Sequence, residues 1–190
     1  MDFPMCCNMY RKLTFIPILL VFASAGAASL HAATLQQLSM DQMSRLATNV
    51  VRARVTGASS SLVLGAATPT IYTHYKLAVT ETWKGSGVSE VMLPGGDLNG
   101  QKQSFPGVPE LKVGKEYVLF LWKSPTTGIM HAIGLTQGIF DVTRQPDGSV
   151  TASRRESGEV MLDRTGHRVS DKAINMKLGD MKSRVSGMRQ

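Results

Sequence analysis

Residues 70–85 read TIYTHYKLAVTETWKG, and this stretch alternates apolar and polar side chains over nearly its whole length. A period of two indicates a β-strand with one buried face. The face directed to the core carries Ile71, Thr73, Tyr75, Leu77, Val79 and Trp83, with Glu81 as a misfit. The opposite face carries Tyr72, His74, Lys76, Ala78, Thr80, Thr82 and Lys84. A strand of about 14 residues exceeds the usual five or six, which is typical of bent or coiled barrel strands.

Further strand signals lie on both sides of this stretch. Residues 49–56 alternate and place Arg52 and Arg54 on the wetter face. The unbroken apolar run EYVLFLW, residues 116–122, predicts a central strand buried on both faces. Additional strands are predicted at residues 89–94, 128–135, 138–144 and 149–153, the last entered through a tight Asp147-Gly148 turn. Two weakly patterned segments lie between these strands: residues 57–70 are predicted as a loop or a wide hairpin connection, and residues 95–114 as a long loop.

Helix signals are confined to the two ends of this strand-rich region. Ser39 followed by Gln42 has the spacing of a capping box, and it predicts a short helix. The apolar stripe of that helix is Leu38, Met43, Leu46 and Ala47. Near the C-terminus, a strand pattern is followed by a helix pattern, carried by Ile174, Met176, Leu178, Met181 and Val185.

The fold class that follows is mainly β, a small closed or half-closed barrel with short flanking helices. We expect a β-barrel domain at residues 33–162. A basic C-terminal extension with a short strand and helix follows at residues 163–190.

The first 32 residues have the pattern of a signal peptide. Arg11 and Lys12 precede a run without charge from Leu13 to Ala33 whose second half is rich in small residues. The prediction is export to the periplasm or secretion. The rival interpretation is a membrane anchor formed by the uncleaved segment, since about 20 apolar residues can span a bilayer.

Cleavage of this segment would remove both cysteines, Cys6 and Cys7, and leave a cysteine-free mature chain. No disulfide or cysteine nucleophile is then available, and we predict no metal site and no cofactor. The mature chain contains no G-x-S-x-G elbow and no S-x-x-K pair, so we assign no catalytic residue.

Six residues are the candidates for a binding surface. Tyr72, His74 and Lys76 share the polar face of the 70–85 strand. Asp97, Asn99 and Phe105 lie in the long loop at residues 94–107. They are candidates because loops of that length are usually functional or disordered. A structural turn at Asp97 and Asn99, or a loop that merely covers the barrel, is the alternative.

The sequence leads to an exported, non-enzymatic and monomeric binding domain for a protein or an envelope polymer, with no nucleic-acid partner expected. One alternative is a hydrolase that uses His74 or His131 with Asp97 or Glu110. A second is contact with a polyanion or membrane surface through the C-terminus, which carries seven Lys or Arg against three Asp from Asp163 onward. The alternative to such binding is a solvated basic tail that only keeps the protein soluble.

Several segments taken together resemble known proteins: VVRARVTG at residues 50–57, IYTHYKLAVTETWKG, MLPGG, the run from Gly107 to Leu121, and GLTQGIF. They resemble a bacterial family of small exported proteins with no assigned activity. The same order is distantly similar to netrin-like modules, including tissue inhibitors of metalloproteinases. That resemblance implies an OB-type barrel. It implies no inhibitory mechanism, because those inhibitors chelate zinc through an amino-terminal cysteine, which the predicted mature chain lacks.

Overall fold

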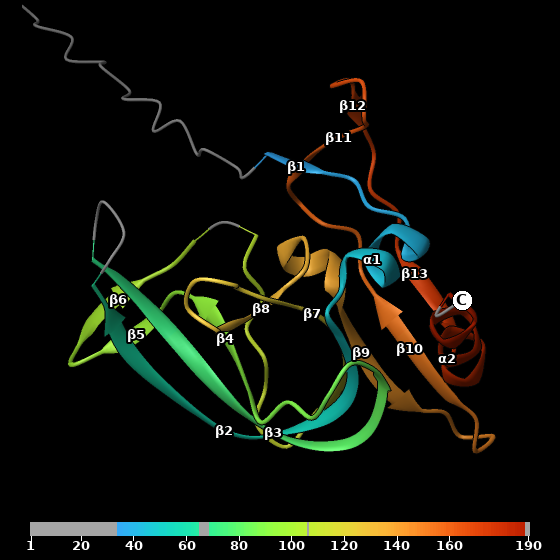
Figure 1. The fold of residues 1–190 in the computed structure, drawn as a ribbon, viewed down its shortest axis with the longest axis horizontal. Coiled ribbons are helices and arrows are strands. Elements are labelled where there is room, and N and C mark those ends of the chain that lie inside the picture. Colours follow the sequence, from blue (N-terminus) through green and yellow to red (C-terminus); the bar gives the residue numbers. More distant parts are fainter. Residues whose placement is uncertain (1–33, 65–68, 106, 189–190) are drawn as a thin grey trace, which may run out of the picture. The chain divides into compact units, whose positions relative to one another are not determined.

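The computed structural model describes residues 34–64, 69–105 and 107–188. The predicted signal segment, with Cys6 and Cys7, lies outside the described residues. Within them the chain is mainly β with two short α-helices, and most strands belong to one long antiparallel sheet (Figure 1). The predicted mainly β class is therefore confirmed.

The main sheet is built on a hairpin of two long strands, β2 (Asn49–Val63) and β3 (Thr70–Lys84). They pair antiparallel from Val50 opposite Lys84 to Val63 opposite Thr70. The register shifts at three places between residues 50 and 57, and such irregularities bend and twist a strand. The long strand predicted from residue 70 is confirmed. The loop prediction for residues 57–63 is wrong, because pairing with β3 holds this segment, GASSSLV, in an extended conformation.

The central strand of the sheet is β7 (Glu116–Lys123), and its residues 117–121 are all buried, as predicted. One edge of β7 pairs with the first half of β2. The other edge pairs first with β9 (Ile139–Arg144) and then with β8 (Met130–Ala132). Beyond β9 the sheet continues through β10 (Val150–Arg154) to β13 (Ile174–Lys177), and β4 (Glu90–Pro94) pairs with β3.

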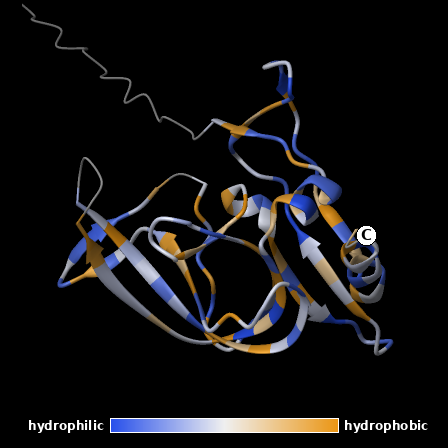
Figure 2. Cartoon of the chain, viewed as in Figure 1, coloured by the Kyte–Doolittle hydropathy of each residue, from blue (hydrophilic) through white to orange (hydrophobic). Residues whose placement is uncertain are grey.

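Two hydrophobic cores lie on opposite faces of β7. The first contains Val118 and Phe120 with Trp83, Phe140 and the apolar sides of both helices. The second contains Leu119 and Leu121 with apolar residues of β2, β3 and β4, among them Val55, Tyr75, Leu77 and Leu93. Figure 2 shows how apolar and polar residues alternate along the long strands that line these cores.

The helices α1 (Met40–Leu46) and α2 (Leu178–Gly187) both pack in the first core. The Ser39 hydroxyl accepts the Gln42 amide in a complete capping box, as predicted. Leu46 was assigned to the buried stripe, which is wrong: it is 56% exposed, and Met40, Met43 and Ala47 fill the core instead. The predicted strand followed by a helix at the C-terminus is confirmed by β13 and α2.

Several small elements were not predicted. The long loop contains a hairpin of β5 (Gly96–Leu98) and β6 (Gln101–Gln103). A separate sheet joins β1 (Thr34–Gln36), β11 (Val160–Leu162) and β12 (Arg168–Val169). The 3-10 helix η1 (Leu135–Gly138) leads into β9.

The described strands do not close into a barrel. β2, β3, β4, β8 and β7 surround the second core, and β4 lies beside β8, but no hydrogen-bonded ladder joins these two strands in the described part of the chain. A cavity of roughly 310 Å³ opens between them, lined in part by Glu90, Met92, Lys123 and Met130. The predicted closed barrel is thus not confirmed.

Candidate functional site

A cavity of roughly 730 Å³ forms a groove beside the β2–β3 hairpin. Five segments line it: Ala58 and Ser60 of β2, Thr73 and Tyr75 of β3, residues 93–97, residues 102–105 and residues 108–113. Its floor is apolar, because Tyr75, Leu93 and Leu111 are buried there. Charged residues of both signs stand at its sides, namely Asp97, Lys102, Glu110 and Lys112. We refer to this cavity as the groove.

One wall of the groove is anchored by two buried tyrosines. The Tyr117 hydroxyl accepts a hydrogen bond of 2.9 Å from the Lys112 amide. Burial raises the pKa of Tyr117 and of Tyr75, so both phenols stay neutral near pH 7. Buried neutral phenols pack as large apolar groups with one hydrogen-bonding end.

An open strand edge adjoins the groove. Next to β7, the ladder on the outer side of β2 ends at Val55, which donates to the Lys115 carbonyl and accepts from Gly114. From Gly57 to Val63, the described strands pair with β2 only on its β3 side. Alternate backbone groups of such a strand point outward and are available to another chain. Because Ala58 and Ser60 also line the groove, the groove and the open edge form one continuous surface.

The six candidate residues from the sequence do not form one surface. Asp97 and Phe105 line the groove, and the Phe105 side chain is 40% exposed at its rim. Asn99 has a positive φ of 53° in the β5–β6 turn, where Asp97 also accepts from the Gly100 amide, so the turn explanation accounts for Asn99. Tyr72, His74 and Lys76 lie on the face of β3 opposite Thr73 and Tyr75, away from the groove.

His74 is the centre of a polar chain that sequence reasoning did not find. Its Nε2 atom lies 2.6 Å from the Ser61 hydroxyl, and its Nδ1 atom lies 2.7 Å from a Glu90 carboxylate oxygen. Neither Asp97 nor Glu110, the carboxylates proposed from the sequence, makes this contact. Ser61, His74 and Glu90 become neighbours only through the registers of three paired strands. Their spacing in the sequence therefore does not predict the contacts.

His131 lies in an aromatic setting. Its ring is 6.0 Å from Trp122 and 6.4 Å from Tyr72, measured between ring centroids. Burial lowers the pKa of His131, which favours the neutral ring. In the described residues, no group of three His, Cys, Asp or Glu side chains is arranged to hold a metal ion.

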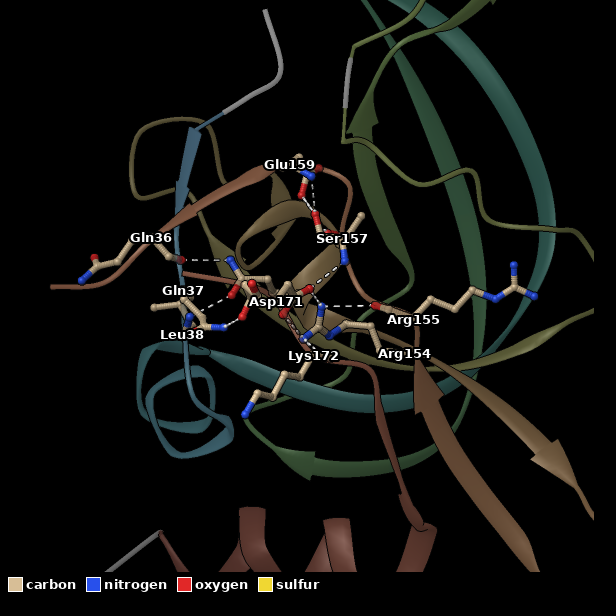
Figure 3. A network of polar contacts seen from close by, with 12 residues as sticks. Gln36, Gln37, Leu38, Arg154, Arg155, Ser157, Glu159, Asp171 and Lys172 are labelled. Carbon is tan, nitrogen blue, oxygen red and sulfur yellow. Dashed lines mark hydrogen bonds and ion pairs between the residues drawn. The ribbon is translucent and has the colours of Figure 1, made fainter. Parts of the chain in front are cut away.

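A second buried polar network ties the C-terminal segment to the sheet (Figure 3). Arg154 and Asp171 form a bidentate pair with distances of 2.6 and 3.0 Å, and both side chains are almost fully buried. Burial raises the pKa of Asp171, but hydrogen bonds from Arg154 and the Ser157 amide outweigh it and lower the pKa below its usual value. Nearby, Glu159 accepts from Ser157 and Thr136. These contacts hold the C-terminal segment against the sheet, and Arg154 and Thr136 also line a cavity of roughly 340 Å³.

Part of the basic C-terminus forms ion pairs with acidic residues at the surface of the fold. Lys182 pairs with Glu81 at 2.6 Å, and Arg184 pairs with Asp41 at 2.7 Å. Exposed basic side chains remain at Arg164, Arg168, Lys172 and Lys177. None of the helices in the described ranges is long and apolar enough to cross a membrane.

Comparison with known proteins adds no assignment: no protein-family model matches the chain, and no curated protein matches it significantly. The resemblance to netrin-like modules stays a prediction.

Proposed function

We propose that the protein is an exported binding protein that holds an extended segment of a partner protein in the groove, along the open edge of β2. The observation that supports this most directly is the edge from Gly57 to Val63, which no described strand pairs on its outer side, next to the groove. Strand addition uses such an edge for affinity and neighbouring pockets for specificity. Export is proposed from the signal pattern of residues 1–32.

The geometry favours a protein ligand over an envelope polymer. A peptide repeats its backbone donors and acceptors at the spacing that a strand edge requires, whereas a carbohydrate does not. The groove adds a place for side chains, since its floor is apolar and Phe105 stands exposed at the rim. The charges around it include Asp97, Glu110, Lys102 and Lys112. Because both signs are present, the groove has no strong preference for a highly charged segment.

The expected affinity is modest. A short added strand gains a few ladder hydrogen bonds of about 1 kcal/mol each. One apolar side chain seated against Phe105 and the floor adds about 2 kcal/mol. Association and ordering of the segment offset part of this, so we expect a Kd on the order of micromolar.

We also propose that β2, β3, β4, β8 and β7 represent a half-closed barrel of the OB type. The five strands surround the second core, and the cavity between β4 and β8 would be the unsealed seam. In this interpretation the groove lies at the mouth of the barrel, where ligand sites are common.

Photo-crosslinking tests the proposed function. The Phe105 position is replaced by a benzoylphenylalanine residue, and the purified protein is irradiated with an envelope extract of its own cell. The control carries the same crosslinker at Leu46, which is exposed but lies on α1. We expect a discrete protein adduct from position 105 alone, and its loss when a proline at Ser59 disrupts the strand edge. Equal adducts from both positions would contradict the proposal.

A further inference from the structure

Ser61, His74 and Glu90 form a hydrogen-bonded chain across three adjacent strands, β2, β3 and β4. The Ser61 hydroxyl is 2.6 Å from Nε2 of His74, and Nδ1 of the same ring is 2.7 Å from the Glu90 carboxylate. The His74 side chain is 23% exposed and that of Glu90 is 40% exposed, so the chain is shielded but reachable from solvent.

The donor and acceptor roles in this chain are fixed by chemistry. An ionised carboxylate only accepts, so a neutral His74 ring carries its proton on Nδ1 and donates it to Glu90. Nε2 is then an acceptor, and the Ser61 hydroxyl donates to it. A hydroxyl that donates to an imidazole held by a carboxylate is the arrangement that activates a serine nucleophile.

The hydrogen bonds of His74 to Ser61 and Glu90 do not join residues that are directly paired in the sheet. Ser59 and Met92 lie directly across from His74, whereas Ser61 is paired with Tyr72 and Glu90 with Lys76. Both partners therefore reach His74 diagonally: Ser61 donates to its Nε2 atom, and its Nδ1 atom donates to Glu90. The result is a line of three functional groups on one face of the sheet.

We propose that Ser61 is the nucleophile of an acyl-transfer site that hydrolyses small O-acyl esters whose alcohol part carries a ring. The ring would lie against Tyr72, which is directly opposite Ser61 and leads to His131 and Trp122. This site is separate from the groove, because Ser60 and Thr73 line the groove and Ser61 and His74 do not. It revises the expectation of a non-enzymatic protein without depending on the proposed binding function.

The reaction balances with groups that are present. The Ser61 oxygen attacks the ester carbonyl carbon while its proton passes to Nε2 of His74. The C–O bond to the alcohol then breaks, and the departing alkoxide takes that proton. Water then attacks the acyl carbon of the acyl-Ser61 intermediate while its proton passes to Nε2 of His74. The bond from the acyl carbon to the Ser61 oxygen breaks, the carboxylic acid leaves, and His74 returns the proton to Ser61. Glu90 is a positioning residue that stabilises the transient imidazolium.

We expect slow turnover. Strand amides around His74 are used in the ladders with β2 and β4, so dedicated donors for an oxyanion are few. Removing one such donor from an enzyme costs about 100-fold or more in rate. Trapping of the nucleophile is therefore a more sensitive assay than steady-state hydrolysis.

The test uses a fluorophosphonate probe on the full-length protein, with the adduct located by mass spectrometry, and p-nitrophenyl acetate hydrolysis as the second readout. We expect an adduct on Ser61, absent in Ser61→Ala, and labelling about 100-fold slower in His74→Gln. Glu90→Gln should slow labelling about tenfold or more. Ser183→Ala, at an exposed serine of α2, is the matched control and should label as the natural sequence does.

Two outcomes would overturn the proposal. One is the absence of any adduct on Ser61 in folded protein. The other is labelling of Ser61 in His74→Gln and Glu90→Gln at the rate of the natural sequence. That result would show that His74 and Glu90 do not activate the Ser61 hydroxyl. Circular dichroism spectra verify the fold of each variant, and Glu90→Gln, at a half-exposed position, keeps the test available if His74→Gln does not fold.

Discussion

Gly96 of β5 lies so close to Thr73 of β3 that a Cβ atom on Gly96 would be 2.5 Å from the Thr73 hydroxyl oxygen. The same atom would be 2.7 Å from the Ser60 hydroxyl oxygen. The φ of Gly96 is +143°, a conformation that residues with a side chain rarely adopt. A glycine is therefore required where the β5–β6 hairpin rests on the β2–β3 hairpin, and this contact shapes one wall of the groove.

Gly96→Ala should displace the β5–β6 hairpin and leave both hydrophobic cores folded. We expect faster proteolysis within residues 95–104 and a melting temperature lower by several degrees, because backbone strain and a close contact together cost about 1–3 kcal/mol. Gly87→Ala is the control, since a Cβ on Gly87 meets no atom within 4 Å. Identical proteolysis of the two variants would contradict this account of the hairpin.

Asp171→Asn should destabilise the protein by about 3 kcal/mol, measured by urea unfolding. The substitution leaves the Arg154 guanidinium buried without its counter-charge, and removing one member of a buried pair is strongly destabilising. Asp180→Asn, at an exposed position in the first turn of α2, should cost less than about 1 kcal/mol. Similar losses in the two variants would show that the Arg154–Asp171 pair is not a structural anchor.

The Arg154–Asp171 pair also limits which variants can test polyanion binding by the basic C-terminus. Deletion of residues 171–190 would remove Asp171, β13 and the α2 residues Met181 and Val185 from the fold. We expect that truncation to unfold the protein rather than to remove a tail. Substitution of the exposed Arg164 and Arg168 is the suitable probe of polyanion binding, which must weaken as salt rises if charge drives it.

Acid should destabilise the protein, and the loss of unfolding free energy at low pH should be smaller in Glu81→Gln. Hydrogen bonds from Lys182, Trp83 and Arg52 lower the pKa of Glu81 to about 2, from 4.5 in the unfolded chain. A lowered pKa stabilises the fold above the unfolded value, and this contribution is lost as the pH falls from about 4.5 to about 2. We expect the natural sequence to exceed Glu81→Gln in unfolding free energy by about 1–2 kcal/mol at pH 7, after allowance for solvent screening.

Urea unfolding of both proteins between pH 7 and pH 2.5 measures this difference. The gap between them should narrow steadily below about pH 4.5, where Glu81 begins to bind a proton in the unfolded state. A gap that stays constant over this range would contradict the assignment of the acid sensitivity to Glu81.

Elements with a clear period were predictable from the sequence. The alternation in β3, the apolar run in β7 and the capping box of α1 are each local patterns with a local physical cause. Residues 57–61 read GASSS and have little strand preference of their own, so only pairing with β3 makes this part of β2 extended. The misfit at Glu81 also has a tertiary cause, since Arg52 and Lys182 surround its carboxylate.

The candidate sites depend on long-range geometry and were only partly predictable. Asp97 and Phe105 were singled out because the loop that carries them is long, and they line the groove. The open edge of β2 could not be predicted, since it depends on where the ladder with β7 ends, at Val55. His74 was noticed, but its partners Ser61 and Glu90 become neighbours only through the strand registers.

A partner segment that adds to the edge of β2 should protect the amides of that edge, and hydrogen exchange measures this most directly. The protein is compared alone and with the polypeptide captured through position 105, using amide exchange resolved to short peptides. We predict slower exchange of outward-facing amides within residues 57–63, with little change in α2. Unchanged exchange at residues 57–63 in the saturated complex would contradict strand addition.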